Sequence, residues 1–471
     1  MSTREYDLVV IGAGPVGENV AHRAVRGGLT AVIVESELVG GECSYWACMP
    51  SKALLRAGTV LNAARSVGGA REAVTGDVDV AGVLARRDGI THDWNDSSQV
   101  EWLHGAGIDL VRGHGRLAGE KRVEVTDADG ETTTLVARHA VAVCTGTAAL
   151  IPDIPGLVDA SPWTSREATS VRDVPDSLVV LGGGVVGAEM ATAFSSFGCR
   201  VTVIARSGLL GSLEPFAGEH VAATLAERGV DILTGVGVDG VSRDAEGVVV
   251  SLSDGREVRA AEILVATGRT PRSEDLGLES VDLEPGDWLE VDDTMRVRGH
   301  DWLYAVGDVN HRVLLTHQGK YQARAAGDVI AARATGADVD DRPWGRHVAT
   351  ADHSAVPQVV FTDPEVAAVG HTEASAREAG LDVRVIDYDL SWIAGASTSS
   401  DDYRGQARVL IDSEREVVVG ATFMGSDVGE LLHSATIAIV GEVPVERLWH
   451  AVPSYPTLSE VWLRWLETYG R

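Results

Sequence analysis

Cys43 and Cys48 are the residues of this chain whose type and spacing most directly indicate chemistry. Four residues separate them, and Pro50-Ser51-Lys52 follows at once. So short a disulfide loop would stabilise the fold by only roughly 2 kcal/mol, which a chain of this length does not need. A pair this close can instead open and close with little backbone movement, and a helix beginning beside it favours thiolate. The spacing therefore predicts a redox-active dithiol, with a small structural disulfide or two buried thiols as the alternative.

A strand–turn–helix–strand unit stands at the start of the chain, before the cysteines. An apolar run at 8–11 leads into a G-x-G-x-x-G turn, and a second apolar run at 31–34 ends in Glu35. The glycines of the turn are Gly12, Gly14 and Gly17. Such glycines let the backbone approach a pyrophosphate at the helix N-terminus, and the acid can accept hydrogen bonds from a ribose. With strand, helix and acid in register, the unit predicts a dinucleotide site rather than an ordinary glycine turn.

The same unit occurs a second time, with one difference at its end. The run 178–181 leads into Gly182, Gly184 and Gly187, and the next strand, 200–204, is followed by Ala205 and Arg206 instead of an acid. An acid would repel a 2′-phosphate, whereas a guanidinium can pair with one. The second unit therefore predicts NADPH in preference to NADH. The alternative for Arg206 is a solvated surface charge.

Composition excludes several classes of function. Asp and Glu number 69 against 40 Lys and Arg, for a formal charge of −29, which disfavours binding to nucleic acid or to anionic membranes. Four cysteines in 471 residues are not a secreted disulfide framework. The N-terminus is polar and no apolar run approaches the roughly 18 residues of a membrane span, so we expect a cytoplasmic protein without a signal peptide.

The rest of the chain suggests a repeated architecture and a third domain. Both units close on a strand ending in Thr-Gly, at Thr145-Gly146 and Thr267-Gly268, and a further buried strand ends at Gly307-Asp308. From about residue 346 the pattern becomes an antiparallel sheet with helices, with strands at 407–411 and 417–421. The helices expected after these strands lie near 428–440 and 458–469. The stretch 92–102 is polar and indicates no function.

These motifs in this order resemble the pyridine nucleotide–disulfide oxidoreductases, a family that includes lipoamide dehydrogenases and mercuric reductases. The resemblance rests on the two units, the cysteine pair with its Pro-Ser-Lys, Gly268-Arg269-Thr270-Pro271, Gly307-Asp308, and the tail Pro456-Thr457-Leu458-Ser459-Glu460. It implies an α/β fold with two Rossmann-like domains, for FAD and NAD(P)H, and a C-terminal α+β domain that forms a homodimer. The expected boundaries are 1–150 with 271–345 for FAD, 151–270 for NAD(P)H, and 346–471 for dimerisation.

The resemblance also implies roles for individual residues. Cys48 would be the thiolate that faces the flavin, Cys43 the outer thiol that meets the substrate, and Lys52 with Glu189 an ion pair beside the flavin. The FAD contacts would be Gly12, Gly14, Gly17, Glu35, Gly41, Lys52, Gly115, Thr145, Gly146, Gly307, Asp308, Leu315, Thr316 and His317. The nicotinamide nucleotide would meet Gly182, Gly184, Gly187 and Arg206, and Gly268 and Arg269 would be further cofactor contacts. No metal-ligand set is expected.

The chain departs from the family pattern in its tail. Family members that exchange disulfides have His-Pro-Thr where this chain has Tyr455-Pro456-Thr457, and a glutamate matching Glu460 orients that histidine. The histidine is the acid and base of thiol exchange, whereas a phenol of pKa about 10 does not readily take a proton at neutral pH. Mercuric reductases also place a tyrosine there, but this chain ends without their C-terminal cysteine pair. His450 is the nearby substitute, with a structural role as its alternative.

The residues between the cysteines differ as well. Ser44-Tyr45-Trp46-Ala47 is bulkier than the family's usual apolar-Asn-x-Gly. Its aromatic side chains would stack on a planar acceptor or only narrow access to the disulfide, with packing in the core as the alternative.

The function predicted from these features is an FAD-dependent NAD(P)H oxidoreductase with a redox-active Cys43–Cys48 disulfide. It would pass electrons from NADPH, or NADH, to a small acceptor such as a quinone or a metal ion, because these need no thiol acid and base. A dithiol/disulfide reductase of the lipoamide dehydrogenase kind is the first alternative. A non-catalytic, redox-sensing flavoprotein is an alternative of another class.

Overall fold

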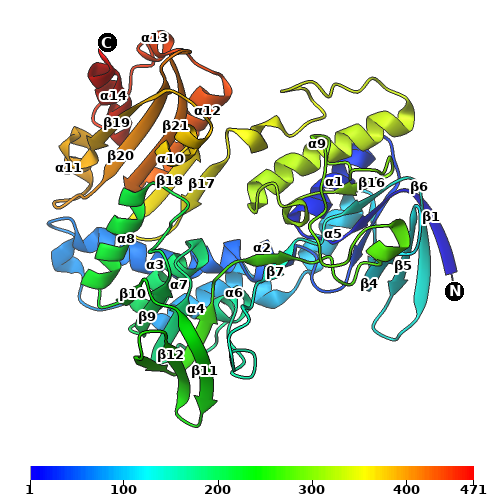
Figure 1. Cartoon of the computed structure of the whole chain (residues 1–471), viewed down its shortest axis with the longest axis horizontal. Coiled ribbons are helices and arrows are strands. Elements are labelled where there is room, and N and C mark those ends of the chain that lie inside the picture. Colours follow the sequence, from blue (N-terminus) through cyan, green and yellow to red (C-terminus); the bar gives the residue numbers. More distant parts are fainter. Residues whose placement is uncertain (1) are drawn as a thin grey trace. The chain divides into compact units, whose positions relative to one another are not determined.

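The computed structural model describes residues 2–471 and divides the chain into two compact units, each assembled from three segments (Figure 1). The first comprises the chain up to Met49 together with Asp88–Ala148 and Arg269–His353. The second comprises Pro50–Arg87, Ala149–Gly268 and Ser354–Arg471. The N-terminal dinucleotide unit of the sequence lies in the first, and the repeated dinucleotide unit lies in the second.

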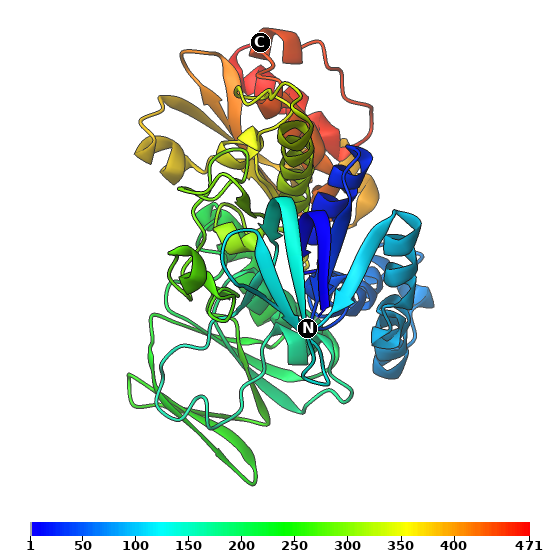
Figure 2. The same ribbon diagram turned by 90° about the vertical axis from the view of Figure 1, so that its right-hand side faces the viewer.

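The first unit is built on a mixed sheet whose central strand is β1 (Ser2–Ile11). β1 pairs in parallel with β2 (Ala31–Glu35) and β6 (Thr132–Val143), so that Val10 is level with Ile33 and Ala142. Figure 2 shows β1 in blue beside cyan strands of this sheet. The full order is β3-β2-β1-β6-β5-β4, with β16 also on β6. These strands are β3 (Ile108–Arg112), β4 (His114–Leu117), β5 (Arg122–Thr126) and β16 (Leu303–Ala305).

Two long helices of the first unit pack against each other. In Figure 1 the yellow-green α9 (Thr316–Thr335) lies beside the blue α1 (Pro15–Arg26). A Cβ on Gly327 would lie 2.6 Å from the carbonyl oxygen of Val20, so the approach requires glycine. Arg23 on α1 forms an ion pair with Asp328 on α9. The shorter elements are α2 (Gly41–Tyr45), α5 (Ser97–Gly105), β7 (Thr147–Ala149) and β15 (Arg269–Pro271).

The second unit repeats the parallel arrangement on a smaller scale. Its parallel strands follow the order β10-β9-β8-β14, with β8 (Ser177–Leu181), β9 (Arg200–Ala205), β10 (Asp231–Thr234) and β14 (Glu262–Val265). An antiparallel sheet follows, with β11 (Val238–Asp244), β12 (Gly247–Leu252) and β13 (Glu257–Ala260). The helices are α4 (Val80–Ile90), α6 (Ser165–Thr169), α7 (Val185–Ser196), α8 (Pro215–Glu227) and, from Pro50 on, α3 (Cys48–Arg65).

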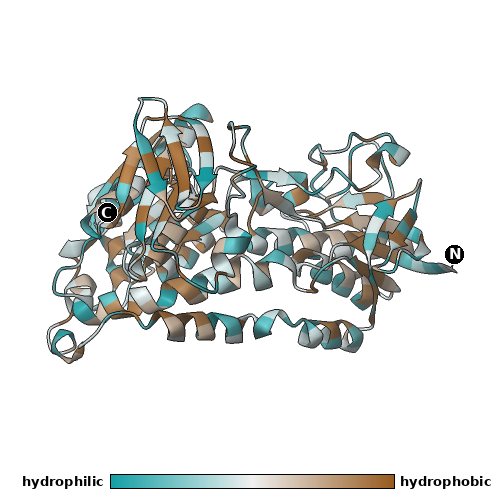
Figure 3. Cartoon of the chain, turned by 90° about the horizontal axis from the view of Figure 1, so that it is seen from below, coloured by the Kyte–Doolittle hydropathy of each residue, from teal (hydrophilic) through white to brown (hydrophobic). Residues whose placement is uncertain are grey.

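The C-terminal part of the second unit is the antiparallel sheet expected from the sequence. Its order is β17-β18-β21-β20-β19, and every residue of the central strand β21 (Val417–Gly425) is buried. Figure 3, coloured by hydropathy, shows strands of the chain in which brown, apolar residues stand next to teal, polar ones. Its other strands are β17 (Pro357–Val360), β18 (Glu365–Gly370), β19 (Val383–Asp389) and β20 (Gln406–Asp412). Its helices are α10 (Glu373–Glu378), α11 (Ala394–Ser399), α12 (Leu432–Val440), α13 (Val445–Leu448) and α14 (Val461–Tyr469).

The predicted fold class is confirmed by this arrangement of two parallel, Rossmann-like sheets and a C-terminal α+β region. The three domain boundaries stay a prediction, because the two compact units group the segments in another way. Across residues 2–471, no helix combines the length and the apolar character that crossing a membrane requires.

Candidate functional site

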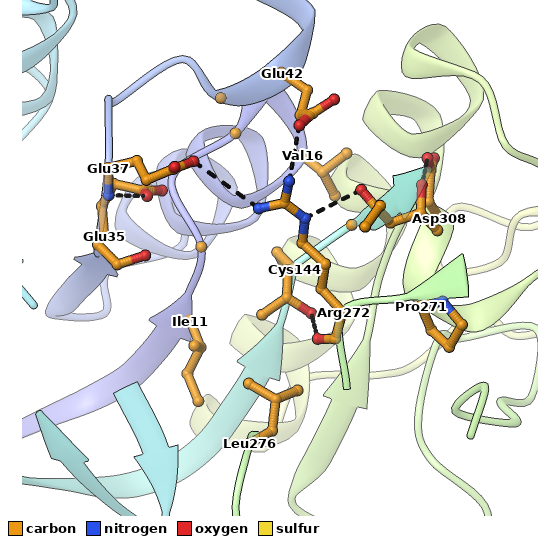
Figure 4. A pocket seen from close by; sticks show the side chains of 18 of the residues that line it. Ile11, Val16, Glu35, Glu37, Glu42, Cys144, Pro271, Arg272, Leu276 and Asp308 are labelled. Carbon is orange, nitrogen blue, oxygen red and sulfur yellow. Dashed lines mark hydrogen bonds and ion pairs between the residues drawn. The ribbon is translucent and has the colours of Figure 1, made fainter. Parts of the chain in front are cut away.

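A cavity of about 630 Å³ lies in the first unit, where strands β1 and β6 end (Figure 4). Ligands of open α/β sheets bind in the crevice outside the carboxyl ends of the parallel strands. Much of its lining was predicted from the sequence: Gly12, Gly14, Glu35, Gly41, Cys43, Gly115, Thr145, Gly146, Arg269, Asp308 and Thr316. The structure thus brings together residues that lie more than 300 positions apart in the chain.

The three positions of the first turn require glycine for different physical reasons. Gly12 has φ +104°, and a Cβ there would lie 2.5 Å from the carbonyl oxygen of Cys144. A Cβ on Gly17 would lie 1.9 Å from the Gly12 oxygen, so glycine here allows the helix to approach the strand closely. Gly17 does not line the cavity. Gly14 does line the cavity, and a Cβ there would meet no atom of residues 2–471 within 4 Å. Close backbone contacts within the fold therefore require glycine at positions 12 and 17. Gly14 leaves space at the start of α1, where a pyrophosphate can bind.

Glu35 is held at the end of β2 by backbone donors. Its Oε2 accepts from the Ala13 amide at 2.7 Å and its Oε1 accepts from the Glu37 amide at 2.8 Å. An ionised carboxylate offers about four lone-pair sites, so Glu35 retains acceptor capacity toward hydroxyl groups in the cavity. Its position and chemistry therefore fit a ribose.

Asp308 contributes a partly buried carboxyl group to the lining of the cavity. Thr147 Oγ1 donates to its Oδ2 at 2.9 Å, and burial raises the pKa of Asp308 above its usual value. Thr145 Oγ1 donates to the backbone oxygen of Arg272 at 2.8 Å, which ties two segments of the wall together. These residues form the polar, preorganised side of the cavity.

Arg272 and two glutamates were not predicted from the sequence. In Figure 4 the Arg272 guanidinium reaches between Glu37 and Glu42, at 3.9 Å and 2.8 Å from their carboxylates. Arg269 also lies 3.6 Å from Glu42. Their positions next to predicted motifs could have indicated these residues. Arg272 directly follows the Gly-Arg-Thr-Pro motif, and Glu42 stands between Gly41 and Cys43.

Cys43 and Cys48 lie in the first unit as thiols. Cys43 is on α2, and Cys48 is the first residue of α3, so the helix begins two residues before the predicted Pro50. The Cys48 sulfur lies 3.3 Å from Thr316 Oγ1, at the start of α9. A hydrogen bond with Cys48, and then burial, raise the pKa of the Cys43 thiol.

Several predicted FAD contacts lie beside the cavity rather than in its lining. Gly307 has φ +81°, and its amide donates to Gln322 Oε1 at 2.9 Å. Leu315 is the residue before α9, and His317, on its first turn, is exposed. Their assignment to the cofactor stays a prediction.

The second turn reproduces the glycine geometry of the first. Gly182 has φ +117°, and a Cβ there would clash with the Ala266 oxygen. A Cβ on Gly187 would clash with the Gly182 oxygen, whereas one on Gly184 would meet nothing within 4 Å among the described residues. Arg206 follows β9, is exposed, and has no ion-pair partner in residues 2–471. Gly268 has φ +153°, and its oxygen accepts from the Leu150 amide at 3.0 Å. The repeated geometry fits a second dinucleotide.

Lys52 and Glu189 form an ion pair in the second unit. Lys52 Nζ lies 2.8 Å from Glu189 Oε2, and the Phe361 amide donates to Oε1 at 3.0 Å. Nζ also lies 4.7 Å from the centroid of the Phe361 ring, as in a cation–π contact. Glu189 is buried, so this pair is more than a surface contact. Its place beside a flavin stays a prediction.

The tail residues Tyr455 and Glu460 differ in their exposure. Tyr455 is 77% exposed, whereas Glu460 is buried and its Oε2 has no hydrogen-bond partner in residues 2–471. Arg464 lies 3.7 Å from the other oxygen, Oε1. His450 is exposed. The buried carboxylate thus keeps one acceptor oxygen without a partner among the described residues.

The aromatic residues between the cysteines separate into two kinds. Tyr45 is 1% exposed, so the core-packing alternative holds for it. Trp46 is partly exposed, with its ring 5.7 Å from that of Tyr45. Of the two, Trp46 is the more exposed.

Comparison with known proteins identifies the family of this chain. Residues 6–327 match the family described as pyridine nucleotide-disulphide oxidoreductase, and residues 356–465 match its dimerisation domain. The chain is 33% identical to a dihydrolipoyl dehydrogenase of Haloferax volcanii over 96% of this chain and 94% of the relative. It is 31% identical to a mercuric reductase of Streptomyces lividans over 97% and 94% of the two chains.

Solved structures show the same fold over the whole length. LpdA from Mycobacterium tuberculosis superposes with a TM-score of 0.83 at 25% identity, covering 100% of both chains. The HOCl-induced flavoprotein disulfide reductase RclA from Escherichia coli, in a Cu(II) complex, gives 0.84 at 22% identity over 99% of both, a likeness of fold alone. With both family matches and relatives above 30% identity, the chain belongs to the pyridine nucleotide–disulfide oxidoreductases, enzymes that bind FAD and use NAD(P)H.

Proposed function

We propose that this enzyme takes hydride from NADPH and passes the electrons through the Cys43–Cys48 pair to a small acceptor such as a quinone or a metal ion. The observation that carries the proposal is Tyr455 in the position of the family's acid/base histidine. Reduction of a disulfide substrate requires a proton for each leaving thiol, and positioned proton transfer contributes typically 10²–10⁴-fold. An acceptor that takes electrons without a leaving thiol does not need that group.

The residues of the cavity have roles that fit this reaction. Gly12, Gly14 and Glu35 would hold the adenosine and pyrophosphate of FAD, and Asp308 with Thr145 its remaining polar chain. FAD, when bound, supplies the hydride and electron chemistry, and the chain orients its reactants. Cys48 would be the thiolate on the flavin side, and Cys43, whose thiol pKa is raised, would meet the acceptor. Lys52, fixed by Glu189, would place a positive charge where a reduced flavin develops negative charge.

NADPH is the proposed hydride donor because of Arg206. Its guanidinium is exposed and follows the strand at the position where NAD-binding units have an acid. It makes no ion pair with the described part of the chain, so it can pair with a 2′-phosphate without losing one. The match to the dimerisation domain supports a homodimer.

A steady-state panel tests the proposal. Purified FAD-loaded enzyme is given NADPH and, in turn, a soluble quinone, a metal salt, lipoamide and glutathione disulfide at matched concentrations. We expect quinone or metal turnover to exceed turnover of either disulfide by at least about a hundredfold. Brisk turnover of lipoamide or glutathione disulfide at pH 7 would contradict the proposal.

A dithiol/disulfide reductase is the second candidate. Dihydrolipoyl dehydrogenases that are 32% and 33% identical to this chain over nearly its whole length favour it. The same panel separates the two candidates, since only this one has lipoamide or another disulfide as its best acceptor. A non-catalytic flavoprotein is no longer a candidate, because the chain belongs to an enzyme family.

A further inference from the structure

A left-handed turn precedes α5 in the first unit. His92, Asp93 and Trp94 have φ values of +52°, +51° and +55°, three consecutive residues other than glycine in a region that such residues seldom adopt. Each residue held there costs on the order of 1–3 kcal/mol and persists only where the surroundings determine it. The turn lies within the polar 92–102 stretch, to which the sequence assigned no function.

The contacts of this turn run to the segment that carries Cys43. The Trp94 indole nitrogen donates to the backbone oxygen of Tyr45 at 3.1 Å. Asp96 Oδ2 accepts from the Val39 amide at 2.8 Å. Arg112 forms an ion pair with Asp96 and donates to the Glu37 oxygen at 2.7 Å. Backbone groups at 37, 39 and 45 are thus all held by side chains from 94–112.

Of these backbone groups, only the Tyr45 carbonyl lies between the two cysteines. Tyr45 ends α2 and stands between Cys43 and Cys48 in the chain. The last carbonyls of a helix have no partner within it and need one elsewhere. Trp94, the last of the three left-handed residues, donates its indole N–H to this carbonyl, so the loop between the two sulfurs has a hydrogen bond to a side chain outside it.

We propose that Trp94 is a positioning residue for the Cys43–Cys48 pair, and that its hydrogen bond to Tyr45 sets the equilibrium between disulfide and dithiol. The inference rests on the proposed function, in which this pair is redox-active. A disulfide already closes the loop covalently, whereas reduction would free the four residues between the sulfurs. The hydrogen bond from Trp94 keeps these residues ordered in the dithiol as well, so reduction gains little conformational entropy. Without this hydrogen bond the dithiol gains that entropy, and the equilibrium shifts toward the dithiol.

The experiment equilibrates FAD-loaded enzyme anaerobically with mixtures of reduced and oxidised dithiothreitol. In this exchange the protein disulfide breaks, two protein thiols form, and reduced dithiothreitol closes its own disulfide, so electrons and protons balance. Alkylation followed by mass spectrometry counts the Cys43 and Cys48 thiols. Trp94→Phe keeps a ring and removes the N–H. We expect it to shift the equilibrium constant about three- to tenfold toward dithiol, or roughly 15–30 mV.

Two further variants separate positioning from stability. Asp96→Ala releases the Val39 end of the same segment and should shift the equilibrium in the same direction, even if Trp94→Phe does not fold. Trp102→Phe, an exposed tryptophan on α5 without a hydrogen bond to the 37–45 segment, is the matched control and should leave the constant unchanged. A merely structural role would lower the thermal midpoint of Trp94→Phe and Asp96→Ala without moving the constant.

The outcomes distinguish this inference from the function on which it rests. Wild-type enzyme whose Cys43 and Cys48 thiol count stays the same across the dithiothreitol series would overturn the redox role of the pair. Wild-type enzyme that titrates normally, with Trp94→Phe and Asp96→Ala both within twofold of it, would overturn the positioning role alone.

Discussion

Lys52 Nζ lies 2.8 Å and 3.1 Å from the two carboxylate oxygens of Glu189, so a partly exposed ammonium meets both sides of a buried acid. The Phe361 amide donates to one of the same oxygens. One buried carboxylate therefore orients a lysine from α3 and a backbone group just after β17. Removing it would affect both at once.

Replacement of Glu189 should separate its charge from its hydrogen bonding. Glu189→Ala leaves the Lys52 ammonium and the Phe361 amide without their acceptor, whereas Glu189→Gln keeps an acceptor but loses the charge. Hydrogen bonds to charged groups contribute roughly 1.5–3 kcal/mol, so we expect a loss of that size for Ala and less for Gln. Thermal denaturation measures this order, and stopped-flow reduction by NADPH should be slower in both variants. Equal stability of the two would contradict the described contacts.

The second prediction concerns Glu18 on α1. Burial raises the pKa of Glu18 to about 7; Lys320 acts in the opposite direction, and Glu35 adds to the rise. The folded protein holds this proton more tightly than the unfolded chain, so the stabilisation is full below pH about 4.5 and is lost as the pH rises through 7.

Glu18→Gln should therefore raise the thermal midpoint at pH 8.5 and change it little at pH 5. Glu101→Gln, an exposed acid on α5, serves as the control and should have no such pH dependence. A Glu18→Gln effect of equal size at both pH values would show that the change acts through packing instead of the proton.

The third prediction concerns nucleotide choice. One charge-assisted contact from Arg206 to a 2′-phosphate contributes about 1.5–3 kcal/mol, which corresponds to a preference of roughly ten- to a hundredfold. We expect kcat/KM to favour NADPH over NADH by that factor, and Arg206→Ala to remove most of the preference through KM for NADPH. Equal kcat/KM for both nucleotides in the wild type, or an unchanged ratio in the variant, would refute the assignment.

The fourth prediction concerns the tail. Tyr455→His supplies a group that titrates near neutral pH, and Glu460 has a carboxylate oxygen free to accept from it. Turnover of lipoamide or glutathione disulfide should rise at least tenfold, toward the 10²–10⁴-fold that such proton transfer provides, while quinone turnover stays nearly constant. The double variant with Glu460→Gln should lose part of the gain. If Tyr455→His changes neither activity, His450 becomes the base to test.

The dinucleotide turns could be predicted from the sequence because their chemistry is local. Gly12 and Gly17 are required by atoms of neighbouring segments, and that requirement appears as a fixed spacing after an apolar strand. Glu35 follows from the same register, and the order of the strands then follows from the repeat of the unit. The antiparallel sheet at the C-terminus also follows from local alternation.

Contacts between distant segments could not be predicted in this way. Arg272 meets Glu42 across 230 positions, and Trp94 meets Tyr45 across 49, without any period or motif that links them. The left-handed conformation of His92–Trp94 could not be predicted either, because none of these residues is glycine, the residue that usually indicates it. For Tyr45 the sequence left a ligand contact and core packing both open, and the buried side chain selects core packing.

The place of β21 in the C-terminal sheet has a consequence for how the chain is made. β21 is the last strand of that sheet to be synthesised, yet it lies between β18 and β20. Until residue 425 has left the ribosome, one edge of β18 and one edge of β20 are unpaired, and the apolar faces meant to cover β21 are uncovered. Such edges are templates for pairing with other chains. Nascent chains paused within 371–425 are therefore the ones that we expect to need a chaperone most.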